Sequence, residues 1–294
     1  MRLITLITLT LIFHWGMAAT KQNDTSKKAV ETGSSIMREV FIRFHSNYEM
    51  SRLHKMGYYQ ESVSDSNSIY YLAEGIIDVY IPSNLNHSDN ASVYPIKTRK
   101  KAFKEIDVNK LLFGNASDMA RSSIWRPNSF LNEKNRDSYT YSYAGETRIK
   151  SDDVKIIEFE PAEGSHGNVK GRIYIDPLYY GIIKIEYTPL TTSSKVWEEV
   201  TWSENFEFRN GAYELVNVTF KGKSTEDNFH YEAFLAMDQQ ETLSEIPQHM
   251  VFIGDNVPLF DTATEISTDS FWEGFEFLKN RIPVDTNYLV AENH

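Results

Sequence analysis

The segment at residues 169–187, VKGRIYIDPLYYGIIKIEY, shows the clearest structural pattern in the chain. Apolar side chains alternate with more polar ones on both sides of a short segment that contains Pro177 and Gly181. Successive side chains of a strand point to opposite faces of a sheet, so this period of two predicts one buried face and one wetter face. Two such runs joined by a short turn rich in Pro and Gly predict a β-hairpin.

Similar alternation recurs along most of the chain. It predicts further strands at residues 57–63, 70–81, 139–143, 155–160, 197–208, 213–221 and 229–235. The dipeptide Asn210-Gly211 between two alternating runs predicts a tight hairpin turn with positive φ. An amphipathic helix with Ser35 as its N-cap precedes the strands, and weaker helical patterning interrupts them. We therefore predict a mostly β (α+β) fold, a curved, half-barrel-like antiparallel meander of about 8–10 strands with helices covering one face.

The N-terminus has the layout of a secretory signal peptide. A basic start at Arg2 is followed by an apolar run at residues 3–13 and small residues near Ala18 and Ala19, where we expect cleavage. The run is shorter than the roughly 20 residues that a membrane-spanning helix needs, so we expect no transmembrane span. The alternative is a buried N-terminal helix. We divide the chain into a signal peptide (1–19), a flexible lead (20–35), a single β-rich domain (36–280) and a C-terminal tail (281–294).

Composition limits the cellular compartments and the classes of binding partner that we expect for this chain. The chain has no cysteine, which excludes disulfides, thiolate metal sites and the lipid-bearing cysteine of a bacterial lipoprotein. Its net charge of −11 disfavours nucleic acid as a partner. The basic run KTRKK at residues 97–101 is the exception, and we interpret it as a solvated loop, with a binding role as the alternative. We expect an exported protein of the periplasm or of the periplasmic face of the outer membrane.

No sequence motif for catalysis or cofactor binding is found. The eight histidines show no metal-ligand spacing, and neither a G-x-S-x-G elbow nor a dinucleotide fingerprint occurs. We therefore predict no catalytic residues, no metal site and no cofactor. His230 and Glu232 fall on one face of a strand, which leaves open an acid/base pair of a hydrolase as an alternative to an exposed polar face.

Tyrosines are the most distinctive candidates for ligand-binding residues in this sequence. Tyr139, Tyr141 and Tyr143 alternate and therefore share one face of a strand, and we place Tyr174 with them on another strand. Tyrosine combines an apolar ring with a polar tip, which suits acyl chains, sugars or peptides. We predict these four residues as a ligand-binding set, and ordinary sheet packing is the alternative.

Several short motifs, in this order, resemble a known family. They are GYYQE (57–61), YLAEGIIDVY (71–80), RPNSFL (126–131), GRIYID (171–176) and FWEG (271–274). The region from about residue 36 to 278 resembles the part that follows the carboxypeptidase-like regulatory domain in exported proteins of Bacteroidetes, although that domain itself is missing. The resemblance implies no enzymatic activity.

Two further expectations come with this resemblance. The meander with its GRIYID hairpin is remotely similar to periplasmic lipoprotein carriers, whose half-barrel sheet holds acyl chains under helices. The triplet around Thr262, Asp-Thr-Ala, is similar to the O-glycosylation acceptor pattern of those bacteria, which makes Thr262 a candidate modification site.

Three functional hypotheses follow. The first is a non-enzymatic envelope protein whose curved sheet binds an apolar or amphipathic ligand or a partner's peptide. The second is a structural or assembly factor for an outer-membrane complex, with the sheet filled by its own core. The third is a hydrolase with dispersed catalytic residues. The sequence leaves open the ligand, the partner and the oligomeric state.

Overall fold

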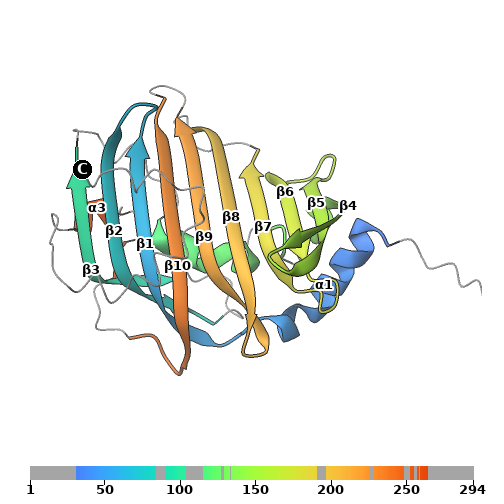
Figure 1. Ribbon diagram of the computed structural model, residues 1–294. Coiled ribbons are helices and arrows are strands. Elements are labelled where there is room, and N and C mark those ends of the chain that lie inside the picture. The colour runs from blue at the N-terminus through green and yellow to red at the C-terminus, as the bar shows by residue number, and fades with distance from the viewer. Residues whose placement is uncertain are drawn as a thin grey trace, which may run out of the picture. The chain divides into compact units, whose positions relative to one another are not determined.

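A ten-stranded antiparallel sheet organises the chain in the computed structural model, in the order β3-β2-β1-β10-β9-β8-β7-β6-β5-β4 (Figure 1). The structure describes residues 31–83, 91–103, 115–126, 129–132, 134–190, 197–224, 228–247, 252–254, 257 and 259–263. All of them belong to the unit Glu31–His294. The predicted signal peptide, the segment 271–278 and the C-terminal tail lie outside the described residues.

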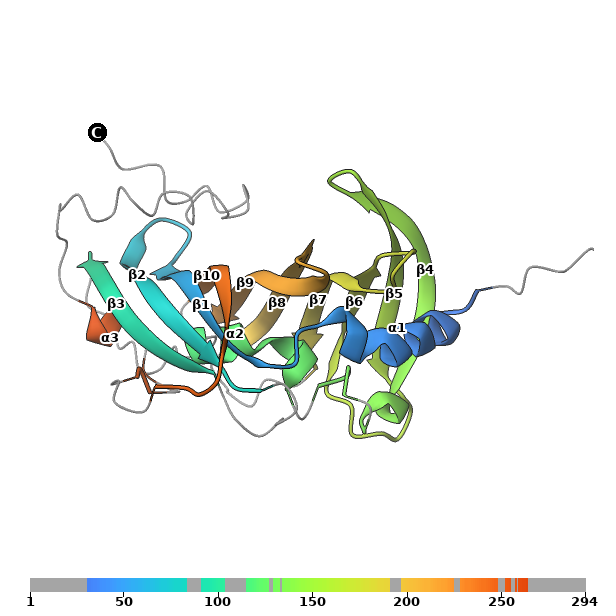
Figure 2. The same ribbon diagram turned by 90° about the horizontal axis from the view of Figure 1, so that it is seen from below.

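The element bounds confirm the predicted mostly β, antiparallel class. The strands are β1 (Arg52–Ser64), β2 (Ile69–Ile81), β3 (Ser92–Ala102), β4 (Tyr139–Ile149), β5 (Asp152–Pro161), β6 (Val169–Ile175), β7 (Ile182–Pro189), β8 (Trp197–Arg209), β9 (Ala212–Ser224) and β10 (His230–Leu243). The helices are α1 (Gly33–Asn47), α2 (Ala116–Trp125), the short α3 (Leu259–Thr262) and a 3₁₀ turn, η2 (Arg136–Ser138). Helices α1 and α2 lie on the same side of the sheet (Figure 2).

The strand order is a meander with one long-range joint. Strands β4 to β10 each pair with the next along the chain, as do β1, β2 and β3. The joint is the pairing of β1 with β10, which runs from Arg52 opposite Leu243 to Ser64 opposite His230. The first and last of the described strands therefore meet inside the sheet.

The hairpin of β6 and β7 forms as the alternation predicts. Ile173, Ile175 and Ile185 are fully buried on the helix-covered face. Gly171 lies opposite Tyr187, and a Cβ on this glycine would overlap the carbonyl oxygen of Glu186. Only glycine permits the close approach of the two strands here.

Two local predictions were wrong. The basic run at residues 97–101 is part of strand β3 and not a solvated loop. Strand β3 lies at the edge of the sheet, where lysines and a proline such as Pro95 discourage pairing with another chain, so its strand signal is weak. Helix α1 is capped by Thr32, and Ser35 occupies the third helical position, where the two side chains form a reciprocal capping box.

The helix-covered face carries the main core. Its buried cluster extends from α1 through α2 and along every strand, and includes Ile36, Met119, Ile157 and Leu235. Beside Tyr59, a void of only about 10 Å³ lies between sheet and helices. The described apolar side chains on this face thus pack into one buried cluster in the place where we expected an acyl chain.

The sheet bends toward its helix-free face without closing. Lys150, in the turn between β4 and β5, lies 2.9 Å from Glu207 of β8, although β6 and β7 separate the two hairpins in the sheet order. A register shift between Tyr143 and Gly145, with φ of 108° at Gly145, marks a bulge in β4. Bulges bend and twist a strand. Figure 2 shows this end of the sheet curling away from the helices.

Candidate functional site

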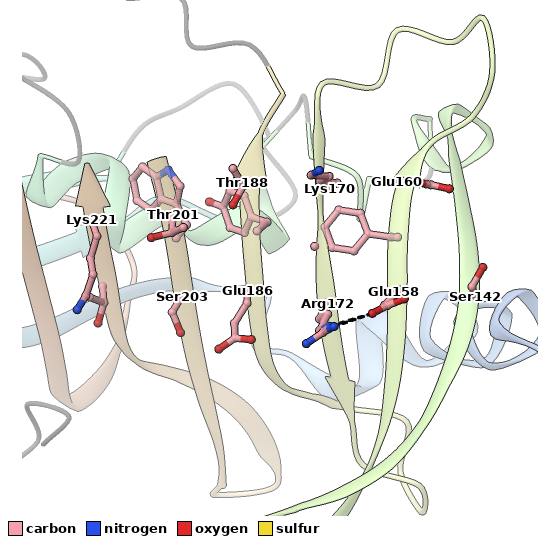
Figure 3. A pocket seen from close by; sticks show the side chains of 15 residues that line it. Ser142, Glu158, Glu160, Lys170, Arg172, Glu186, Thr188, Thr201, Ser203 and Lys221 are labelled. Carbon is pink, nitrogen blue, oxygen red and sulfur yellow. Dashed lines mark hydrogen bonds and ion pairs between the residues drawn. The ribbon is translucent and has the colours of Figure 1, made fainter. Parts of the chain in front are cut away.

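The helix-free face holds a depression of about 720 Å³ that spans β4 to β9. Figure 3 shows the labelled polar side chains of its lining on the side of the sheet that faces the viewer, with the helices behind the sheet. The lining follows from the same alternation that builds the core. Ile157, Ile173 and Ile185 point to the helix-covered face, so Glu158 and Glu186 next to them point into the depression.

Strand register arranges the lining in a continuous row. Each residue of the row is the direct cross-strand partner of the next: Ser142, Glu158, Arg172, Glu186, Ser203 and Thr219. Direct partners in an antiparallel sheet have Cβ atoms about 4.5–5.5 Å apart, close enough for their side chains to interact. The row therefore presents three alternating charges, with hydroxyls on either side of them.

The charged side chains of the row are largely occupied with one another. Arg172 donates two hydrogen bonds to Glu158 Oε1, at 3.0 and 2.8 Å. Glu186 accepts a hydrogen bond of 2.8 Å from Tyr174 and lies 2.5 Å from Lys184 Nζ. Partial burial by itself would raise the pKa of Glu186, but Lys184 and Tyr174 outweigh it and lower this pKa.

The overall charge of the lining is balanced. Glu158, Glu160 and Glu186 face Lys170, Arg172 and Lys221. Among the described residues, Lys170 and Glu160 have no ion-pair partner, whereas Lys221 lies 3.3 Å from Glu232. The lining therefore exerts little net electrostatic attraction on a strongly anionic or cationic ligand, although the chain as a whole carries a negative net charge.

Four hydroxyls line the depression on β7, β8 and β9: those of Thr188, Thr201, Ser203 and Thr219. Within the described part of the chain, none of them has a hydrogen-bond partner. A hydroxyl can both donate and accept, so this cluster can pair with amides, carbonyls or other hydroxyls. The sequence carried the signal, because Thr201 and Ser203 alternate with buried residues of β8, but polar positions of a strand do not reveal that a face is concave.

The predicted tyrosines divide between the two faces. Tyr139, Tyr141 and Tyr143 share the helix-covered face. Tyr139 is buried, and Tyr141 donates a hydrogen bond of 2.9 Å to the carbonyl of Phe130. Burial raises the pKa of Tyr141. Tyr143 is 39% exposed.

Tyr174 lies on the opposite, helix-free face, where it bonds to Glu186. The structure thus does not bring Tyr174 together with the other three tyrosines, and a binding role for any of the four stays a prediction. Thr262 is exposed at the end of α3. Its modification also stays a prediction.

The described residues offer no candidate metal site and no candidate membrane-spanning helix. No group of three His, Asp or Glu that could hold a metal ion occurs in the described ranges. In those ranges, no helix combines the length and the hydrophobicity that crossing a membrane requires. The carboxylate of Glu232 faces Lys221, as in an exposed ion pair, and a catalytic pair with His230 stays a prediction.

Comparisons with known proteins give structural neighbours at low identity. No family model and no curated protein match the chain, so the resemblance to the carboxypeptidase-like regulatory domain family has no support. A DUF1329 family protein from Desulfovibrio piger shares 10% identity at a TM-score of 0.38, over 73% of this chain and 95% of the other.

Two more solved structures are similar to the chain at comparably low identity. A protein domain from Vibrio parahaemolyticus, described as outer membrane lipoprotein-sorting, shares 11% identity at a TM-score of 0.38, over 72% and 94% of the two chains. A LolA superfamily protein from Nitrosomonas europaea shares 12% identity at a TM-score of 0.34, over 77% and 100%. These are distant likenesses of fold, and no function of these proteins passes to this chain.

Proposed function

We propose that this chain is a non-enzymatic envelope protein that binds an extended, polar segment of a partner protein in the depression on the helix-free face of β4 to β9. The observation that carries the proposal is the cluster of four hydroxyls that have no hydrogen-bond partner among the described residues, in a concavity of about 720 Å³. Concave sites with a few convergent polar groups are the usual places where proteins hold ligands.

The polarity of this face favours a peptide over an acyl chain. Covering the hydroxyls of Thr201 and Ser203 with hydrocarbon would remove them from water without giving them partners, which is unfavourable. A peptide supplies amide donors and carbonyl acceptors. The balanced charges of Lys170 and Glu160 at the rim suit side chains of either sign. On the helix-covered face, the described apolar side chains are packed against one another in a buried cluster.

A structural or assembly factor without a ligand is the second candidate. The continuous core between sheet and helices favours it, because such a protein needs only a stable scaffold. The two candidates differ in the surface that meets the partner. Only the first requires the depression to be accessible and in contact with another protein.

In-cell photo-crosslinking tests the first candidate. A photoreactive amino acid replaces Ser142 at the rim of the depression, and a matched control carries it at Lys134, which is exposed outside the depression. We expect a discrete protein adduct from position 142 and none from position 134. Adding Thr201→Glu, which places a charge among the hydroxyls, should abolish that adduct. The proposal is wrong if position 142 gives no adduct or if Thr201→Glu leaves it unchanged.

A further inference from the structure

The turn between β6 and β7, at residues 176–181, lies at the end of the sheet near α1 (Figure 1). Apolar side chains are exposed there. Leu178 is 70% exposed and Tyr179 is 52% exposed. Phe208, near the end of β8, is 55% exposed and stacks on Tyr179, with ring centroids 5.8 Å apart and planes 3° from parallel. We call Leu178, Tyr179 and Phe208 the apolar tip.

Side chains of the turn itself and of α1 fix the backbone of this turn. The carboxylate of Asp176 accepts hydrogen bonds from the backbone N–H groups of Leu178 (2.6 Å) and Tyr179 (3.1 Å). Arg43 of α1 donates to the carbonyl of Leu178 at 3.3 Å, and Asn47 of α1 donates to the carbonyl of Tyr179 at 3.1 Å. The exposure of the apolar tip is therefore built into a well-supported turn.

The packing beneath the turn supports the same conclusion. The second carboxylate oxygen of Asp176 accepts a hydrogen bond of 2.7 Å from the hydroxyl of Tyr213. A Cβ on Gly181 would overlap the ring of Tyr213, so the turn sits as close to β9 as glycine permits. Tyr180 adopts a positive φ of 58° and lies under the Arg43 guanidinium, 4.7 Å from the ring centroid. The conformation is set before any partner arrives, which lowers the entropic cost of binding.

The hydrogen bonding of the turn points to a lipid surface as its partner. A backbone group that enters a bilayer must already have its hydrogen bond inside the protein. The N–H and C=O groups of Leu178 and Tyr179 all meet this condition. Tyrosine and exposed aliphatic side chains are also typical of the region between lipid headgroups and acyl chains.

The charges around the apolar tip are compatible with such insertion. Arg43 lies 3.5 Å from Glu39, and Lys150 lies 2.9 Å from Glu207. The chain as a whole carries a net charge of −11, which opposes binding to anionic lipids. We propose that the apolar tip inserts into the surface of a neutral lipid bilayer and holds the protein there without a spanning helix. This inference does not depend on the polar depression.

Vesicle flotation with the full-length chain, purified after export, tests the proposal. We expect the wild-type protein to float with phosphatidylcholine vesicles, and more weakly when phosphatidylglycerol is added. Leu178→Ser and Phe208→Ser should each lower the partition coefficient roughly tenfold, since each removes one large apolar side chain from the contact. The matched control is Leu190→Ser, which alters a leucine that is 48% exposed beyond the other end of β7 and should leave flotation unchanged.

Circular dichroism spectra of the three variants would show that each is folded. The proposal fails if the wild-type protein stays with the unbound fraction, if Leu178→Ser floats as well as the wild type, or if Leu190→Ser weakens flotation equally. It also fails if sedimentation shows a dimer that Leu178→Ser dissociates, because the apolar tip would then face a second copy of the chain.

Discussion

Glu204 links the sheet to α2 and offers the sharpest test of how the core is held. Its side chain is fully buried on the helix-covered face of β8. The carboxylate accepts hydrogen bonds from the Ser122 hydroxyl (2.6 Å), the Ser123 backbone N–H (2.8 Å) and the Ser123 hydroxyl (2.8 Å). The Tyr187 hydroxyl adds a fourth at 3.2 Å. These bonds hold α2 at Ser122, whose φ of 59° interrupts the helix.

The expected loss of stability follows from these hydrogen bonds. Glu204→Gln keeps the shape but turns charge-assisted hydrogen bonds into neutral ones, for an expected loss of about 2 kcal/mol. Glu204→Ala leaves several buried donors without an acceptor, for an expected loss of about 4 kcal/mol. Replacing Glu204 also removes a carboxylate that interacts favourably with the buried guanidinium of Arg126. Burial alone would lower the pKa of this guanidinium, but Tyr187, Asp118 and Glu204 raise it by attraction.

Urea denaturation followed by tryptophan fluorescence measures both losses, since Trp202 is buried in the same region. The matched control is Glu186→Gln on the helix-free face, where the carboxylate is 41% exposed and its ion pair contributes about 0–1 kcal/mol. If Glu204→Gln loses no more stability than Glu186→Gln, then the buried carboxylate does not hold α2 as described.

Two further predictions concern the strand backbone and a buried lysine. The Cβ of Gly171→Ala would overlap the Glu186 carbonyl and lie 2.7 Å from Tyr187 Cα. We therefore expect a loss of about 3 kcal/mol in the free energy of unfolding. An unchanged thermal midpoint would contradict this expectation. Burial lowers the pKa of Lys55 to about 8, only partly opposed by Glu214. In the unfolded chain lysine titrates near pKa 10.4, so from about pH 8 to about pH 10 the unfolded state binds more protons and stability should rise with pH. The urea midpoint should rise with pH across this range in the wild type and not in Lys55→Met. Equal slopes of midpoint against pH in the two proteins would refute the prediction.

Local patterns predicted the parts of the fold that are local. Alternation gave the β6–β7 hairpin, and Asn210-Gly211 forms the predicted turn, with positive φ at both residues (51° and 89°). The pairing of β1 with β10 has no local signal, because the two strands lie far apart in sequence. Strand β3 was missed because its edge position tolerates the lysines and Pro95 that suggested a loop.

The candidate site was predictable in character but not in shape. Alternation indicated one polar face, which is the face of Arg172 and Ser203. Its concavity depends on the bulge at Gly145 and on the contact of Lys150 with Glu207, which no sequence period encodes. The tyrosines illustrate the same difficulty. Alternation along one strand shows which residues of that strand share a face, but whether Tyr174 shares a face with Tyr139 on another strand depends on the register between the strands.

The joint between β1 and β10 also has a consequence for how the chain folds. Strands β1 to β3 can pair early, but the free side of β1 has no neighbour until β10 arrives, and the Arg52 side chain bonds to the Ser244 carbonyl across 192 positions. Closing so long a loop slows folding, and an unpaired strand edge meanwhile invites pairing with other chains. A chain truncated before residue 230 would therefore keep two separate ribbons with open edges and would aggregate.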